Sequence, residues 1–163
     1  MSLTIRPAVR ADVERIRSFI LALADYERLA HEARPDAALL EQHLFGPHPK
    51  AEVLIAEIDG EPVGFALFFH NFSTFESRPG LYLEDLFVMP QARGRGVGKA
   101  LIVRLAQLAV ERDCARFEWW VLDWNQPALD FYRSLGARPM DAWTVQRVDG
   151  AALLALAGNG GGQ

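Results

Sequence analysis

The sequence predicts an α/β fold of the α+β type, in which helices pack on both faces of a mixed, mostly antiparallel sheet. Three observations carry this prediction. Asp59-Gly60 is a hairpin signal between two apolar runs with strand character. A helix-period stretch lies between two later strand-like runs, which gives a parallel β-α-β unit. The order of elements offers too few parallel strands before its glycine-rich turn for a doubly wound dinucleotide-binding domain.

The first elements alternate between a strand and two helices. Leu3–Arg6 is predicted to be a short strand, which Pro7 limits. From Asp12, apolar residues recur at helical spacing and predict a helix that frays at residues 25–28. A second helix is predicted to follow Pro35 and to stop before Gly46. Its buried side is expected to carry Leu39, Leu40 and Leu44.

The middle of the chain predicts three strands. Residues 53–58 and 62–69 form the hairpin around Asp59-Gly60, and a polar loop is expected over residues 71–80. A strand then runs from Tyr82 to Pro90. Strand alternation places Glu84 and Asp85 on opposite faces of the sheet, unless a bulge intervenes.

The last part of the chain contains two further helix–strand pairs. A helix is predicted from Val97 to residues 112–113, followed by a strand over residues 117–122. Asn125 is a suitable N-cap for another helix, which Gly136 closes. A last strand over residues 143–148 and a short apolar helix ending at Ala157 complete the fold.

Length and composition predict one domain over residues 1–157, with a disordered tail at residues 158–163. The 163 residues are 50% hydrophobic, which suffices for one core. Apolar runs are too short to cross a bilayer, and the N-terminus lacks the pattern of a signal peptide, so we expect a cytoplasmic protein with no membrane partner.

The net charge of the chain and the spacing of its histidines indicate which ligands it can bind. A formal net charge of −4 argues against nucleic-acid binding and suits a cationic or zwitterionic small substrate. The four histidines show no metal-ligand spacing, so no metal is predicted. The single cysteine, Cys114, is expected to be a structural thiol with no histidine close to it.

The turn at residues 93–98 is the strongest chemical feature of the sequence. Its spacing, Arg-x-x-Gly-x-Gly, is neither the dinucleotide fingerprint nor a Walker loop. Glycines, two arginines and a helix start meet at this point, and such a turn can offer backbone N–H groups to an anion. A pyrophosphate site is the working hypothesis; a flexible basic turn without a ligand is the alternative.

Together with four further sequence blocks, this turn resembles a known family. The span 83–99 is similar to the acetyl-CoA signature of the GNAT (GCN5-related N-acetyltransferase) superfamily. Blocks 5–8, 24–27, 82–90 and 121–127 resemble its diamine (spermidine/spermine) acetyltransferase subfamily, including the thialysine-acetylating branch. The resemblance implies acetyl transfer from acetyl-CoA to a primary amine by direct attack in a ternary complex, in a homodimer.

The resemblance also implies roles for individual residues. Glu84 would accept the proton of the attacking ammonium, or alternatively only anchor a cationic substrate. Tyr132 would be the general acid for the departing thiolate, although a Tyr on an apolar helix face is, taken alone, more often a core residue. Residues implied in holding acetyl-CoA are Leu86, Phe87, Val88, Arg93, Gly94, Arg95, Gly96, Val97, Gly98, Lys99, Asn125, Pro127, Ala128 and Tyr132.

Substrate selection is assigned by family position. The amine site is expected to include Tyr26, Glu27, Glu84, Asp85, Glu118, Trp119, Trp120 and Trp143, although each tryptophan could instead lie in the core or at a dimer interface. Polyamine enzymes of the family carry Asp and Trp where this chain has Ser73 and Phe75. A small lysine-like amino acid such as thialysine is therefore the expected substrate. Diamines, a protein amine and a non-catalytic acetyl-CoA-sensing or protein-binding module are the alternatives.

Overall fold

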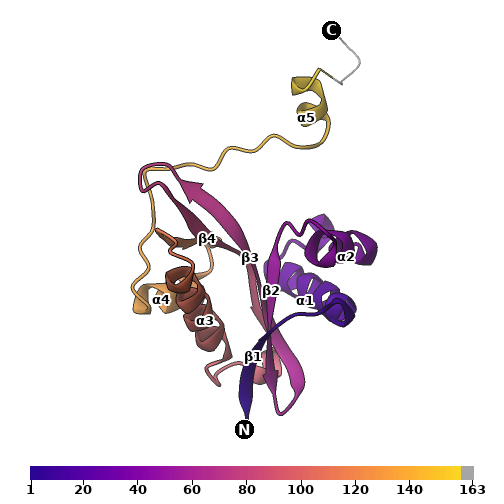
Figure 1. The fold of residues 1–163 in the computed structure, drawn as a ribbon, viewed down its shortest axis with the longest axis vertical. Helices are drawn as coiled ribbons and strands as arrows, with labels where there is room; N and C mark the ends of the chain where they lie inside the picture. The colour runs from indigo at the N-terminus through magenta and orange to yellow at the C-terminus, as the bar shows by residue number, and fades with distance from the viewer. Residues whose placement is uncertain (159–163) are drawn as a thin grey trace. The chain divides into compact units, whose positions relative to one another are not determined.

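The computed structural model describes residues 1–158, so all but the first residue of the predicted tail at residues 158–163 lies outside this part of the chain (Figure 1). The chain divides into two compact units, Met1–Leu122 and Asp123–Gln163. A single domain over residues 1–157 stays a prediction.

The first unit is built on one five-stranded sheet in the order β1-β2-β3-β4-β5. The pairs β1–β2, β2–β3 and β3–β4 are antiparallel, and only β4–β5 is parallel. This confirms the predicted mixed, mostly antiparallel sheet with one β-α-β unit. The strands are β1 (Leu3–Pro7), β2 (Glu52–Ile58), β3 (Glu61–Ser73), β4 (Arg78–Val88) and β5 (Phe117–Trp119).

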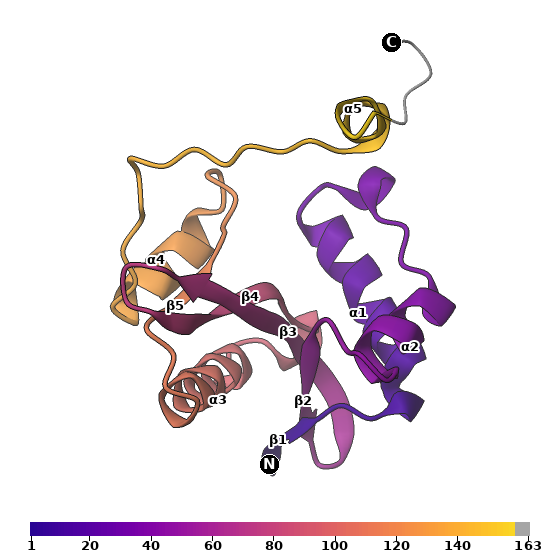
Figure 2. The same cartoon turned by 45° about the horizontal axis from the view of Figure 1, so that its top comes forward.

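Helices cover both faces of this sheet (Figure 2). Helices α1 (Val13–Tyr26) and α2 (Ala37–Phe45) lie on one face, and α3 (Val97–Glu111) lies on the other. Short 3₁₀ turns occupy Arg10–Asp12, Ala30–Glu32 and Pro90–Ala92. The core on the α1 side consists of Ile16, Phe19, Leu44, Val53, Ile55, Phe65 and Phe87.

Two details on this side of the chain differ from the sequence prediction. Leu39 is 54% exposed and not buried, because α2 contacts the core through Leu40 and Leu44. The loop expected over residues 71–80 is wrong, since β3 and β4 continue pairing as far as Ser73 and Arg78. Polar side chains in this stretch indicated a loop, but a hairpin whose outer part is solvated tolerates them.

The second unit contains α4 (Gln126–Ser134) and α5 (Gly150–Leu156), as predicted. The strand expected over residues 143–148 is wrong: these residues have no regular structure. Trp143, Val145 and Val148 are 78%, 55% and 49% exposed. A strand requires a neighbour to pair its backbone groups, and none pairs with this segment within residues 1–158.

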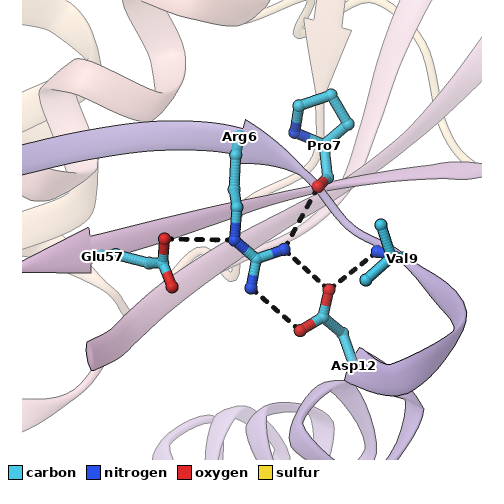
Figure 3. A network of polar contacts seen from close by, with 5 residues as sticks. All are labelled: Arg6, Pro7, Val9, Asp12 and Glu57. Carbon is cyan, nitrogen blue, oxygen red and sulfur yellow. Dashed lines mark hydrogen bonds and ion pairs between the residues drawn. The ribbon is translucent and has the colours of Figure 1, made fainter. Parts of the chain in front are cut away.

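A polar network fastens β1 to the start of α1 (Figure 3). The Arg6 guanidinium donates to both carboxylate oxygens of Asp12, at 2.8 and 3.0 Å, and pairs with Glu57 at 3.1 Å. Asp12 also accepts from the backbone N–H of Val9 at 2.7 Å. Hydrogen bonds from Arg6 lower the pKa of Asp12 below its usual range, although burial opposes the shift.

Replacing Asp12 with Asn should lower the free energy of unfolding by about 2 kcal/mol at pH 7, because hydrogen bonds to a charged group are lost. A carboxyl whose folded pKa is depressed stabilises the fold above its unfolded pKa and loses this contribution as the pH falls through the folded pKa. The difference in the free energy of unfolding between the wild type and Asp12→Asn should therefore become smaller below about pH 4. Urea unfolding at pH 7 and pH 3 measures it; an equal difference at both values would contradict the assignment.

Candidate active site

Strand β4 carries a bulge at Glu84. Opposite β3, Asp85 pairs with Leu67 whereas Leu83 pairs with Phe68, so Glu84 is an extra residue on β4. Residues 65, 67 and 69 of β3 share one face, and they oppose Phe87, Asp85 and Tyr82. The bulge, which the sequence left open, thus brings Tyr82 and Asp85 to the same face of the sheet, the face of the core cluster and α1.

An acidic group surrounds this bulge. Burial, followed by the charges of Glu84 and Glu27, raises the pKa of Asp85 to about 7. Burial also raises the pKa of Glu27. The pKa of Tyr82 is raised by burial and then by Glu84, Glu118 and Asp85. Four carboxyl groups therefore lie close to the bulge, and a bound cation would relieve their repulsion.

The Asp85 carboxylate should cost the folded protein stability at high pH. Because its folded pKa is raised, the folded protein holds this proton more tightly than the unfolded chain, and stability falls as the pH rises from about 4 to 7. Asp85→Asn should raise the free energy of unfolding by about 2 kcal/mol at pH 8 and have little effect at pH 3.5.

The exposed surface residue Asp141 provides a matched control, and Asp141→Asn should change stability by less than about 0.5 kcal/mol at either pH. Thermal or urea unfolding measures both variants. If Asp85→Asn is less stable than the wild type at pH 8, the Asp85 carboxylate already has a favourable partner. That result would contradict the hypothesis that this site binds a cation.

Strands β4 and β5 separate next to the bulge. Their parallel pairing covers only Leu81–Phe117, Tyr82–Glu118 and Leu83–Trp119. Beyond Leu83, β4 continues to Val88 with no β5 partner among the described residues. The predicted strand at residues 117–122 is therefore shorter than expected, and the backbone of residues 84–88 is left with one side open to another hydrogen-bonding group.

The turn at residues 93–98 has the conformation that its glycines suggested. Gly94 and Gly96 have φ of +78° and +79°, which side-chain-bearing residues rarely adopt, and Gly96 is the N-cap of α3. The first helical bond runs from Ala100 N–H to Gly96 C=O, so the N–H groups of residues 97–99 point out of the helix start without an intrahelical acceptor. This end of α3 fits a pyrophosphate.

Arg93 lies between the turn and the end of α1. Its Nε donates to the carbonyl of Val88 at 3.0 Å. Its guanidinium carbon lies 5.1 Å from the ring centroid of Tyr26 and 5.5 Å from that of Phe87. Arg95 and Lys99, the other cations of this segment, are both exposed.

The second unit carries the catalytic candidate Tyr132 and the cofactor-binding candidate Asn125 on one helix, α4. The side chain of Asn125 accepts from Ala128 N–H at 3.3 Å, which confirms Asn125 as the N-cap of α4, with Pro127 in the first turn. Tyr132 lies two turns along α4, and its ring is 5.6 Å from that of Phe131. A seven-residue spacing places two residues on the same side of a helix, so a shared side for Asn125 and Tyr132 stays a prediction.

The aromatic substrate candidates are distributed over both units. In the first unit, Trp120 is 59% exposed and meets the Tyr82 ring edge-on at 6.0 Å, whereas Trp119 packs on Phe117 at 4.9 Å. Trp143 belongs to the second unit. Tyr82 itself was not predicted as a site residue, because regular alternation without the bulge places it on the opposite face from Asp85.

Cys114 is not remote from histidine, contrary to the sequence expectation. Its Sγ lies 3.8 Å from His70 Nδ1, because β3 passes beside the end of α3. His70 Nδ1 lies 3.0 Å from the carbonyl of Gly80 and Nε2 lies 3.0 Å from the Arg112 guanidinium. A carbonyl only accepts and a guanidinium only donates, so Nδ1 is the donor and Nε2 the acceptor in these two contacts. Burial raises the pKa of the Cys114 thiol, which disfavours a nucleophilic thiolate.

Residues 1–158 contain neither a metal-binding cluster nor a membrane-spanning helix. No group of three or more His, Cys, Asp or Glu side chains there could hold a metal ion. No helix in this part of the chain combines the length and apolar character needed to cross a bilayer.

Sequence comparison relates the chain to acetyltransferases. The profile of the Acetyltransferase (GNAT) family matches residues 17–137. A thialysine N-epsilon-acetyltransferase of Sus scrofa is 38% identical over 168 residues, which cover 96% of this chain and 98% of the relative. The spermidine/spermine N(1)-acetyltransferase-like protein 1 of Homo sapiens is 31% identical over 94% of this chain and 23% of its own length.

Structure comparison agrees with the sequence comparison. An integron cassette protein from the mobile metagenome of V. cholerae superimposes with a TM-score of 0.81 at 28% identity, covering 96% of this chain and 98% of the other. Two independent kinds of similarity thus extend over nearly the whole chain.

Proposed function

The chain belongs to the GNAT acetyltransferase family and is an acetyl-CoA-dependent N-acetyltransferase of the thialysine/polyamine branch, and on this premise we propose that it acetylates the side-chain amine of a small lysine-like amino acid such as thialysine. The observation that carries the proposal is the acidic group around the β4 bulge. Its carboxyls at residues 27, 84, 85 and 118 suit an incoming ammonium group.

Acetyl-CoA would be held by the α3 turn and the open end of β4. The N–H groups at the start of α3 and the side chains of Arg95 and Lys99 meet the requirements of a pyrophosphate. The backbone of Leu86–Val88 can pair with the amides of the pantetheine arm, since β5 has already left β4. When bound, acetyl-CoA supplies an activated acetyl group as a thioester. The residues Asn125, Pro127 and Ala128 are proposed to complete the contact.

Two side chains of this protein are proposed to transfer protons, one as an acceptor and one as a donor. Glu84, exposed on the bulge, is proposed to take a proton from the substrate ammonium, so that a neutral amine is available for attack. The Tyr132 hydroxyl is proposed to give a proton to the departing sulfur. Neighbouring Asp85 and Glu27 would strengthen binding of the ammonium, and Tyr26, Trp119, Trp120 and Trp143 are proposed to border the substrate.

The hairpin tip favours an amino acid over a long polyamine. Ser73 is 1% exposed, and its hydroxyl accepts a hydrogen bond from Glu76 N–H at 3.2 Å. Phe75 is 94% exposed and carries no charge. Neither residue 73 nor residue 75 therefore provides a carboxylate for the distal amine of a polyamine. Diamines are the second candidate class. A homodimer is also proposed; light scattering of the purified protein measures its mass directly.

Calorimetry followed by a thiol-release assay tests the proposal against a non-catalytic sensor. We expect acetyl-CoA to bind the full chain, and free thiol to appear only when a lysine-like amine is added. Binding without amine-dependent thiol release would contradict the enzyme and favour a sensing or protein-binding module. Acetylation of peptides in place of free amines would instead indicate a protein acetyltransferase.

A further inference from the structure

One guanidinium joins three segments that the proposed function uses separately. Arg93 begins the glycine turn, and its Nε–H donates to Val88 C=O at the end of β4. The same group lies 5.1 Å from the ring centroid of Tyr26, the last residue of α1, and 5.5 Å from that of the buried Phe87. Turn, strand end and helix end thus converge on a single side chain.

Arg93 contacts the core through Phe87 and the proposed amine site through Tyr26. Phe87 belongs to the core and stacks obliquely on Phe19 of α1, at 6.2 Å between centroids, so this side of the guanidinium has a rigid support. Tyr26 is 40% exposed and is followed by Glu27, one of the carboxyls of the acidic group. Arg93 is therefore the side chain through which a displacement of the turn would reach Tyr26 and Glu27.

We infer that Arg93 is a positioning residue that couples the acetyl-CoA turn to the amine-binding end of α1. This inference rests on the proposed function. Ordering of the turn by the nucleotide would fix Arg93 against Tyr26 and restrict the end of α1, so that coenzyme A increases the affinity for the amine. Linkage requires the amine to increase the affinity for coenzyme A by the same factor.

Lysine cannot replace Arg93 in this role. A planar guanidinium can lie beside an aromatic ring while its Nε–H donates to a carbonyl, whereas an ammonium is a compact, strongly hydrated point charge. Arg93→Lys keeps the positive charge that attracts phosphate and removes the planar group. Tyr26→Leu removes the aromatic ring on the α1 side alone. Arg15→Lys is the matched control, since it makes the same change on an exposed side chain near the start of α1, away from the turn.

Hydrogen exchange of the backbone amides at the end of α1 measures the coupling between the turn and α1 in the absence of turnover. The amides of Glu27, Arg28 and Leu29 donate to Leu23, Asp25 and Ala24 at 2.9, 3.0 and 2.8 Å. Saturating coenzyme A should slow their exchange about two- to fivefold in the wild type. This factor corresponds to the free energy of one cation–π contact. We expect Arg93→Lys and Tyr26→Leu to abolish this protection and Arg15→Lys to retain it.

Calorimetry of lysine-like amine added to the coenzyme A complex provides the second readout. The two- to fivefold gain in amine affinity caused by coenzyme A should disappear in Arg93→Lys, while its affinity for coenzyme A falls less than about threefold. Unchanged α1 protection in Arg93→Lys, or its loss in Arg15→Lys as well, would overturn the inference. Failure of the wild type to bind coenzyme A would overturn the proposed function too, whereas binding without α1 protection would overturn only the coupling.

Discussion

Replacing Tyr132 with Phe should lower kcat about 100-fold or more while changing the dissociation constant of acetyl-CoA less than about threefold. The substitution removes only the hydroxyl. The ring that lies 5.6 Å from Phe131 stays, so packing of α4 is preserved. If the hydroxyl gives a proton to the departing sulfur, its loss acts on the chemical step and not on ground-state binding.

Steady-state kinetics and calorimetry on the same preparation separate the two quantities. Thermal unfolding is the control for packing, and the midpoint should move by only a few degrees. An equal loss of kcat and of acetyl-CoA affinity, or a large loss of thermal stability, would show that Tyr132 is a core residue and not the acid.

Replacing Glu84 with Gln should lower kcat/KM for the amine about 100-fold at pH 7, and by progressively less as the pH approaches about 10. At neutral pH nearly all of a lysine-like amine is ammonium and needs a base to remove its proton. Near pH 10 a substantial fraction is already neutral. The side chain of Gln has nearly the same size, so the bulge on β4 should persist.

The pH–rate profile of Glu84→Gln is the measurement. Glu111→Gln, which changes an exposed carboxyl paired with Arg104 on α3, is the matched control and should leave the profile unchanged. A loss in Glu84→Gln that is the same at every pH would remove the base assignment and leave Glu84 as an electrostatic anchor.

Asp85 gives this pH profile a second expected feature. With a pKa of about 7, its carboxyl changes charge in the range where the substrate is still an ammonium. Ionisation of Asp85 places a further negative charge beside Glu84 and Glu27, so amine affinity should increase as the pH rises through 7. The stability and the binding strength of this site thus respond to pH in opposite directions, as expected where function is supported at the expense of stability.

Local patterns predicted the helices and most of the strands. The apolar spacing after Asp12, the N-cap at Asn125 and the glycines of the turn each depend on a few neighbouring residues, and the structure contains the corresponding elements. Fold class followed from the order of these elements. The strand at residues 143–148 failed because strand formation requires a partner from elsewhere in the chain or assembly, which alternation alone does not reveal.

Non-local features of the site were harder to predict. The bulge at Glu84 is a property of the pairing between β3 and β4, and no residue type there requires it. The proximity of His70 and Cys114 depends on where β3 passes α3. The contact between Arg93 and Tyr26 joins residues that are 67 positions apart in the sequence. The proposed roles of Glu84 and Tyr132 came from family resemblance, because neither residue type alone distinguishes catalysis from packing.

The most direct test of the account is a comparison of kcat/KM for thialysine, lysine, ornithine and spermidine at saturating acetyl-CoA, with the acetylated nitrogen of each product located by mass spectrometry. The proposed site predicts acetylation of the side-chain amine of the amino acids, with thialysine at least about tenfold better than spermidine, a difference of roughly 1.4 kcal/mol in transition-state stabilisation. A higher kcat/KM for spermidine, or acetylation of the α-amine, would contradict it.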